Sequence, residues 1–134
     1  MTAPVFIDTG YILALLNKRD KYHRAATLMP RTLAYMTTEA VLTEIGNALS
    51  RPLWRALAVD TLHDLRHDPA IEVVTVDAGL FERAVALYAA RPDKSWGLTD
   101  CISFVVMQEY ALTHVVTTDQ HFMQAGFQNV LRLV

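Results

Sequence analysis

Short apolar runs alternate along the chain with longer segments in which apolar side chains recur every three or four residues. The short runs are rich in β-branched and aromatic residues and predict buried strands at 4–8, 33–36, 71–76, 114–118 and near 130–133. The longer segments predict helices at 12–16, 21–29, 37–50, 52–67 and 78–90, another from 100 onward, and a short one ending near 125. This alternation indicates a single α/β domain over residues 1–134, with a mostly parallel central sheet flanked by helices on both faces.

The most apolar of the predicted helices follows a polar turn and carries an acid at its start. From Ile102 onward nearly every side chain is apolar, which predicts a helix buried on most of its surface. Thr99 or Asp100 is placed to cap the first free backbone N–H groups, and Asp100 complements the positive end of the helix dipole. The sequence thus puts a carboxylate at the mouth of a buried element.

Three other acids occupy comparable places. Asp8 and Asp119 each follow an apolar strand directly, and Glu44 lies at the edge of the core-facing stripe of helix 37–50. In an open parallel sheet, the carboxyl ends of the strands and the helix N-termini that follow lie along one edge, where ligands bind. We therefore expect four carboxylates to meet at this edge: Asp8, Glu44, Asp100 and Asp119. Polar neighbours of these acids are Thr9, Thr99, Thr118 and, one turn from Glu44, Asn47.

A cluster of carboxylates without a counter-ion is unfavourable, because like charges in a cleft raise one another's pKa. Oxygen-only ligands suit a hard divalent cation, Mg²⁺ or Mn²⁺, which keeps some of its waters. The chemistry that follows is hydrolysis of a phosphodiester bond by a metal-activated water. The alternative is structural: a single Asp at a strand end or helix start is usually a cap, and Glu44 is free to reach water or an arginine.

Composition narrows the class of protein. Of the 134 residues, 52% are hydrophobic and 19% are charged, which suits a well-packed core and argues against disorder. The net charge of -2 weakens nucleic-acid binding without excluding it, because local patches matter more than the sum. A lone cysteine, Cys101, excludes an internal disulfide. With no leader peptide and no membrane-length apolar run, we expect a cytoplasmic protein that does not associate with membranes.

Other candidate sites have less support. Gly10 stands where a haloacid-dehalogenase-type phosphoacceptor site has its second Asp, and no Gly-rich phosphate loop is present. The five histidines show no zinc spacing that the acids support. Cys101 is better explained as a small core residue than as a nucleophile.

Four blocks of the sequence resemble, in order, those of PIN-domain proteins. The blocks are Phe6-Ile7-Asp8-Thr9, Thr37-Thr38 through Val41-Leu42-Thr43-Glu44-Ile45-Gly46-Asn47, Leu98-Thr99-Asp100-Cys101-Ile102-Ser103-Phe104 and Thr117-Thr118-Asp119-Gln120-His121-Phe122. They are most similar to the VapC-like ribonucleases of toxin–antitoxin pairs. The resemblance implies a PIN-like fold, frequent homodimers and a Mg²⁺- or Mn²⁺-dependent endoribonuclease that acts on RNA, with any antitoxin as a separate chain. It also implies that Asp8, Glu44, Asp100 and Asp119 bind the metal, supported by Thr99, Thr118 and Asn47.

Substrate contacts are expected at the rim of the acidic edge. Basic residues that would hold phosphates there are Lys18, Arg19, Lys21, Arg24, Arg91 and Lys94, of which we select Arg19 and Lys94. Trp96 would stack a base. Alternatively, these charges are solvated surface and Trp96 packs against its own loop. Leu53, Trp54 and Leu57 would form either a dimer face or part of the monomer's core.

Two further functions are compatible with the acid set. A PIN-like module that holds RNA or a protein partner would bind the metal without cleaving RNA. A metal-dependent phosphatase would hydrolyse small phosphoesters and leave RNA intact. We favour the ribonuclease because the whole acid set is present.

Overall fold

A parallel sheet forms the centre of the protein in a computed structural model that describes residues 3–133. The described part of the chain contains five strands: β1 (Val5–Ile7), β2 (Tyr35–Thr38), β3 (Ile71–Val74), β4 (His114–Val116) and β5 (Gln128–Asn129). They pair in the order β3-β2-β1-β4-β5, and every pair is parallel. The central strand β1 aligns Phe6 with Met36 of β2 and with Val115 of β4. The predicted α/β fold is thus confirmed.

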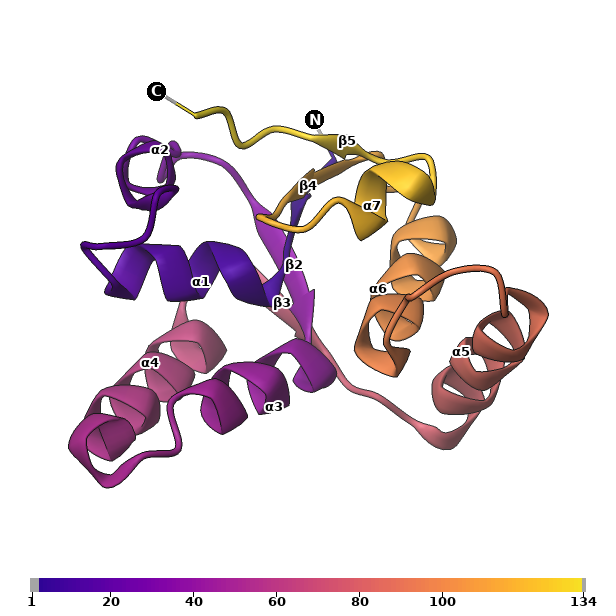
Figure 1. The fold of residues 1–134 in the computed structure, drawn as a ribbon, viewed down its shortest axis with the longest axis horizontal. Helices are drawn as coiled ribbons and strands as arrows, with labels where there is room; N and C mark the ends of the chain where they lie inside the picture. The colour runs from indigo at the N-terminus through magenta and orange to yellow at the C-terminus, as the bar shows by residue number, and fades with distance from the viewer. Residues whose placement is uncertain (1–2, 134) are drawn as a thin grey trace.

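Helices cover both faces of this sheet. Their bounds are α1 (Thr9–Leu16), α2 (His23–Thr27), α3 (Glu39–Ala48), α4 (Arg55–His67), α5 (Ala78–Ala90), α6 (Leu98–Glu109) and α7 (His121–Gln124), with one 3₁₀ turn, η1 (Pro52–Trp54). Figure 1 shows α1 to α4 on one side of the sheet and α5 to α7 on the other. None of the helices in residues 3–133 is long and apolar enough to cross a membrane.

The order of the strands sets the position of a crevice. The chain builds outward from β1 to β3 on one side and then crosses to β4 and β5 on the other. The direction of winding therefore reverses between β1 and β4, and ligands of open parallel sheets bind at the carboxyl ends of the strands that flank such a reversal. Asp8 and Asp119 follow these two strands.

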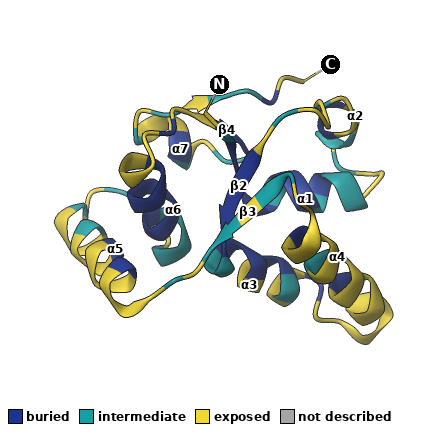
Figure 2. Cartoon of the chain, turned by 180° about the vertical axis from the view of Figure 1, so that it is seen from behind, coloured by how far each residue is buried: buried dark blue, intermediate teal, exposed yellow. Residues whose placement is uncertain are grey.

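The core is packed most tightly around α6. Every residue of this helix from Cys101 to Met107 is buried, as its apolar sequence predicts, and Figure 2 shows α4 and α5 mostly exposed by comparison. Phe104 of α6 packs edge-on against Phe122, with ring centroids 4.9 Å apart, and Phe122 lies 6.2 Å from Phe6 of β1. These aromatic contacts fix α6 and α7 against the central strand, and so hold the residues at the start of both helices in place.

Several of the predicted boundaries are wrong, and the first helix begins at Thr9 instead of residue 12. The second strand is 35–38, because Thr37 and Thr38 are fully buried and Thr37 Oγ1 donates to the Ile7 carbonyl at 2.9 Å. Thr38 then caps α3 by accepting from the Val41 backbone N–H. The last strand is Gln128–Asn129, not 130–133. The helix α6 begins at Leu98 after the N-cap Gly97, so neither Thr99 nor Asp100 is the cap.

Candidate metal centre

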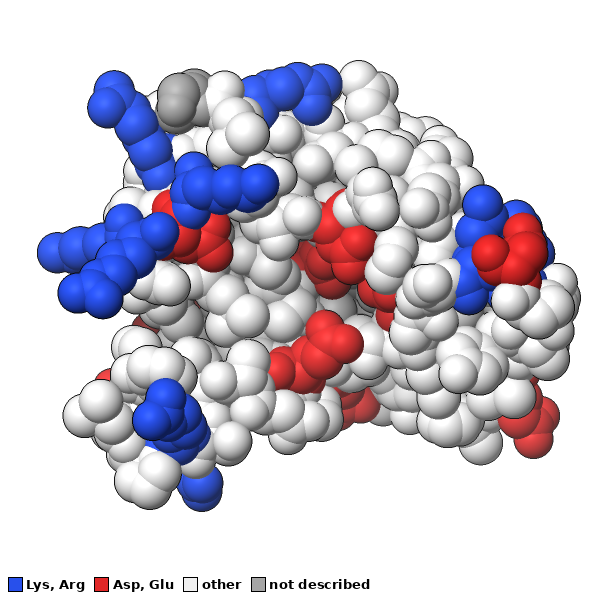
Figure 3. Space-filling model, in the orientation of Figure 1, with Lys and Arg blue, Asp and Glu red and all other residues white. Residues whose placement is uncertain are grey.

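The four acids of the sequence prediction come from four different segments around the reversal point. Asp8 follows β1, Glu44 lies on α3, Asp100 lies in the first turn of α6, and Asp119 lies between β4 and α7. In Figure 3 acidic side chains gather in a hollow in the middle of the visible face. The negative charges of Asp100 and Glu44 both contribute to raising the pKa of Asp8.

Asp8 is the most deeply buried of the four acids. Its side chain is 5% exposed, and Oδ2 accepts a hydrogen bond of 2.7 Å from Thr117 Oγ1. Although Asp8 holds the N-cap position of α1, its side chain makes no capping hydrogen bond. Burial, together with the negative charges of Asp100 and Glu44, raises its pKa from 3.8 to about 7. Its carboxylate is therefore costly to ionise without a nearby cation.

Thr117 links the two strands that end at the site. Its hydroxyl donates to Asp8 and accepts from the backbone N–H of Asp119 at 2.9 Å. The side-chain amide of Asn129 makes two hydrogen bonds with the backbone of Thr117. Its Oδ1 accepts from the Thr117 N–H at 3.2 Å, and its Nδ2 donates to the Thr117 carbonyl at 3.0 Å. Sequence reasoning chose the neighbouring Thr118 instead. The only signal for Thr117 was its place two residues after Val115 in the predicted strand 114–118.

His121 joins the acids Asp100 and Asp119. Its ring nitrogen Nδ1 lies 2.9 Å from Asp100 Oδ2 and 3.2 Å from Asp119 Oδ2. One ligand atom from each of the three residues lies within 4.8 Å of the others. Carboxylate oxygens and an imidazole nitrogen are donors that divalent cations accept, so this group fits a metal site. The sequence analysis did not select His121, although it stands two residues after Asp119.

Asp100 and Asp119 also serve their own backbone. Asp100 Oδ2 accepts from the Gly97 N–H at 3.0 Å, which ties the start of α6, and Asp119 Oδ1 accepts from the His121 N–H at 2.9 Å. Both acids therefore also accept hydrogen bonds from nearby backbone N–H groups, which is the structural role considered for them above. In Asp119 this leaves Oδ2, the oxygen that faces His121, whereas in Asp100 the same Oδ2 takes both the Gly97 N–H and the contact with His121.

The supporting residues differ in how they meet the acids. Thr9 Oγ1 donates to Glu44 Oε1 at 2.5 Å, which fixes a side chain that stands at an exposed position of α3. Thr118 packs against Gly10, where an added Cβ would lie 2.0 Å from Thr118 Oγ1. Thr99 is half-buried, and Asn47 is exposed. The structure gives Asn47 no side-chain hydrogen bond within the described residues.

Base stacking by Trp96 is contradicted by its surroundings. The side chain is 6% exposed, its Nε1 donates to Gln124 Oε1 at 3.0 Å, and its ring meets Phe104 edge-on at 5.0 Å. Arg91 covers the ring at 5.1 Å and pairs with Asp93 at 3.0 Å. Trp96 therefore anchors its own loop, as the alternative had it.

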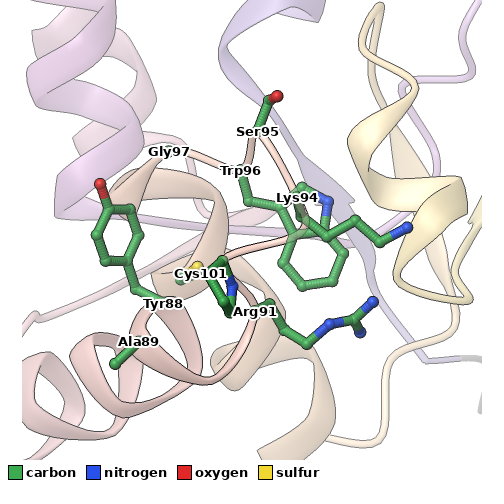
Figure 4. Close-up of a pocket in the computed structure, with 9 residues that line it drawn as sticks. Tyr88, Ala89, Arg91, Lys94, Ser95, Trp96, Gly97 and Cys101 are labelled. Carbon is green, nitrogen blue, oxygen red and sulfur yellow. The ribbon is translucent and has the colours of Figure 1, made fainter.

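The two selected cations lie on different segments of the chain. Lys94 lines a cavity of about 660 Å³ beside the loop that leads into α6, and its side chain extends alongside that of Arg91 (Figure 4). Arg19 is exposed in the turn between α1 and α2. Figure 3 shows a basic cluster at the α1–α2 side and a smaller one at the opposite edge of the same face.

The apolar residues near η1 are not part of the core. Leu53 is 85% exposed, Trp54 38% and Leu57 40%. Of the two alternatives considered for these residues, burial in the monomer's core is therefore excluded, and a surface role is left.

Comparison with known proteins agrees with the fold and with the order of the blocks. The structure of VapC20 from Mycobacterium tuberculosis, described as a toxin that cleaves the sarcin–ricin loop, superposes with a TM-score of 0.83 at 27% identity, over 92% of this chain and 96% of that one. A structure of FitAcB from Neisseria gonorrhoeae gives a TM-score of 0.61 at 17% identity, over 93% and 95% of the two chains, and shows the shared fold. A comparison with curated protein sequences found no match. The PIN-domain profile matches residues 5–128, so the chain belongs to the PIN-domain family.

Proposed function

We propose that this protein is a Mg²⁺- or Mn²⁺-dependent endoribonuclease and the toxin of a toxin–antitoxin pair. The observation that carries the proposal is the buried carboxyl of Asp8 at the reversal point of the sheet, within the field of Asp100 and Glu44 and joined through Thr117 to the backbone of Asp119. Acids that share one crevice would need a cation, and PIN-family membership supports a nuclease.

In the proposed mechanism, Asp8, Asp100 and Asp119 hold the metal, together with Glu44. A bound divalent cation would lower the pKa of an attacking water and stabilise charge on the leaving oxygen of the RNA backbone. Glu44 has Oε1 fixed by Thr9, so its other oxygen would face the metal or the water that the metal holds. Thr117 keeps Asp8 turned toward the site.

RNA would be held by the cations at the two sides of the hollow. The segment between α1 and β2 carries five exposed basic residues: Lys18, Arg19, Lys21, Arg24 and Arg31. None of them forms a salt bridge within the described residues, so their charge is available to phosphates. Lys94 would take the phosphates on the other side. Arg19 and Lys94 thus remain the proposed substrate contacts, with Trp96 removed from that set.

Protein partners follow from the same family comparison. VapC20 is described as a toxin, and we propose that this chain likewise has an antitoxin as its partner. We also propose a homodimer that covers Leu53, Trp54 and Leu57, which otherwise present apolar surface to water. An RNA substrate and an antitoxin partner fit a cytoplasmic protein. Sedimentation of the wild type and of Leu53→Glu would test the dimer, with dissociation of the variant as the expected result.

The function is tested by cleavage of a stem-loop RNA that carries the sarcin–ricin sequence, and of total ribosomal RNA, with Mg²⁺, Mn²⁺ or a chelator. We expect cleavage only with metal, and a loss of about a hundredfold or more in Glu44→Gln and Asp8→Asn. Asp60→Asn, an exposed acid on α4, is the matched control and should cleave like the wild type. Full activity of Asp8→Asn would refute the mechanism.

The same assay separates the two other functions. Metal and RNA binding by the wild type without cleavage of either RNA would favour a silent binding module. Hydrolysis of p-nitrophenyl phosphate without action on RNA would favour the phosphatase.

A further inference from the structure

The ring of His121 lies where a metal ligand would be. Its Nδ1 contacts Asp100 at 2.9 Å and Asp119 at 3.2 Å, and the side chain is 22% exposed, compared with 14% for Asp100. Donors that share one cation at bond lengths of about 2.1 Å lie about 3 to 4 Å apart. The contacts of His121 with both acids fall in this range.

The backbone holds the ring in this place. The N–H of His121 donates to Asp119 Oδ1, so the residue that follows β4 and the residue that opens α7 form one local unit. Phe122, which comes next, is fully buried against Phe6 and Phe104 and anchors that unit to the core. The ring nitrogen that faces the acids is therefore preorganised.

Whether Nδ1 carries a proton determines whether the ring would bind a cation or donate hydrogen bonds to the two acids. In the imidazole whose proton is on Nε2, Nδ1 carries a lone pair, and a lone pair that faces two carboxylates is repulsive unless a cation lies between them. In the form protonated at Nδ1, the ring would donate to both acids and only hold them together. The first arrangement uses all three donor atoms at once.

We infer that His121 Nδ1 is a direct ligand of the divalent cation, together with Asp100 and Asp119, which makes this a mixed nitrogen–oxygen centre. The inference rests on the proposed metal-dependent function. It replaces the oxygen-only ligand set expected from the sequence. Because imidazole binds Mn²⁺ and later transition metals in preference to Mg²⁺, His121 would make the centre selective for Mn²⁺.

Pulsed electron paramagnetic resonance of the full chain with Mn²⁺ and no RNA tests this inference. We expect modulation from a directly bound ¹⁴N nucleus in the wild type, replaced by the ¹⁵N pattern when the protein is labelled with ¹⁵N-histidine. His121→Gln keeps a polar side chain without the ring nitrogen and should bind Mn²⁺ without that signal. His114→Gln, an exposed histidine bonded only to Thr113, is the matched control and should keep it.

Calorimetric titration gives a second readout. The ratio of the Mg²⁺ to the Mn²⁺ dissociation constant should fall about tenfold in His121→Gln and stay unchanged in His114→Gln, since even outer partners of a metal change its affinity by this much.

The outcomes separate the inference from the proposed function. Mn²⁺ bound to the wild type without nitrogen coupling would overturn the inference alone, and His121 would then be a positioning residue that holds two acids. The absence of any Mn²⁺ binding to the wild type would overturn both. The labelled wild-type spectrum decides the question even where His121→Gln fails to fold.

Discussion

The stability of the metal-free protein should fall as the pH rises, and Asp8 should be a main cause. The carboxyl of Asp8 ionises near 3.8 in the unfolded chain and near 7 in the folded protein. Between these values the folded state keeps a proton that the unfolded state releases, so the free energy of unfolding decreases as the pH increases. The full interval corresponds to a cost on the order of 4 kcal/mol above pH 7.

Asp8→Asn removes this cost and keeps most of the contacts. The amide oxygen of Asn can still accept from Thr117 Oγ1, while the side chain carries no charge near Asp100 and Glu44. At pH 8 in a chelator, we expect the variant to be more stable than the wild type by a few kcal/mol, up to about 4. The difference should shrink toward pH 4, where the wild-type carboxyl is protonated in the folded state.

Urea unfolding of both proteins at several pH values measures this difference directly. Subtraction of the two curves removes the titration of all groups that they share. Asp60→Asn, on the exposed surface of α4, should show no such pH-dependent gain. The reasoning would be refuted by an Asp8→Asn variant that is less stable than the wild type at pH 8, or by a gain that does not change with pH.

Other substitutions test single contacts, each by its effect on the urea midpoint. Gly10→Ala should lower the free energy of unfolding by about 1–3 kcal/mol, because its Cβ would lie 2.0 Å from Thr118 Oγ1. Adding Thr118→Ala to this variant should restore most of that stability. A further loss of stability in the double variant would contradict the clash. Ser103→Ala should stabilise the protein by about 1 kcal/mol, because the buried Oγ has no hydrogen-bond partner within the described residues; a clear loss would show that the hydroxyl is bonded. Trp96→Ala should cost about 3–5 kcal/mol and Trp96→Phe only about 1 kcal/mol; a Trp96→Phe variant of unchanged stability that no longer bound RNA would contradict the anchoring role.

Local signals were enough to predict most of the fold. The helix predicted at 78–90 is found as α5, and Asp77 caps it by accepting from the Leu80 N–H, since a cap needs only a few neighbouring residues. The second strand was misplaced because Thr37 and Thr38 are polar in sequence, yet both are buried. The hydrogen bond from Thr37 to Ile7 that permits this burial joins residues 30 positions apart, which no local pattern reveals.

The residues of the candidate site likewise divide into those with a local sequence signal and those placed by long-range contacts. An acid that directly follows an apolar strand is a local signal, and it identified Asp8 and Asp119 as neighbours at the edge of the sheet. His121 meets Asp100 across 21 positions of sequence, and Thr117 meets Asp8 across 109. Such contacts follow from the strand order and from the aromatic packing of α6 and α7. These two residues were therefore missed, while the roles of the four acids stay predictions.

The hydrogen bond from Thr117 to Asp8 has a consequence for the timing of synthesis. Asp8 leaves the ribosome before its neighbour strand β4 and its partner hydroxyl, which are made more than a hundred residues later. Because domains fold as units and parallel strands must wait for their partners, β1 stays without one flank until residues 114–117 emerge. A growing chain therefore holds its acids apart. If these acids form a nuclease, the ribosome that makes it is not exposed to its activity until synthesis has passed β4.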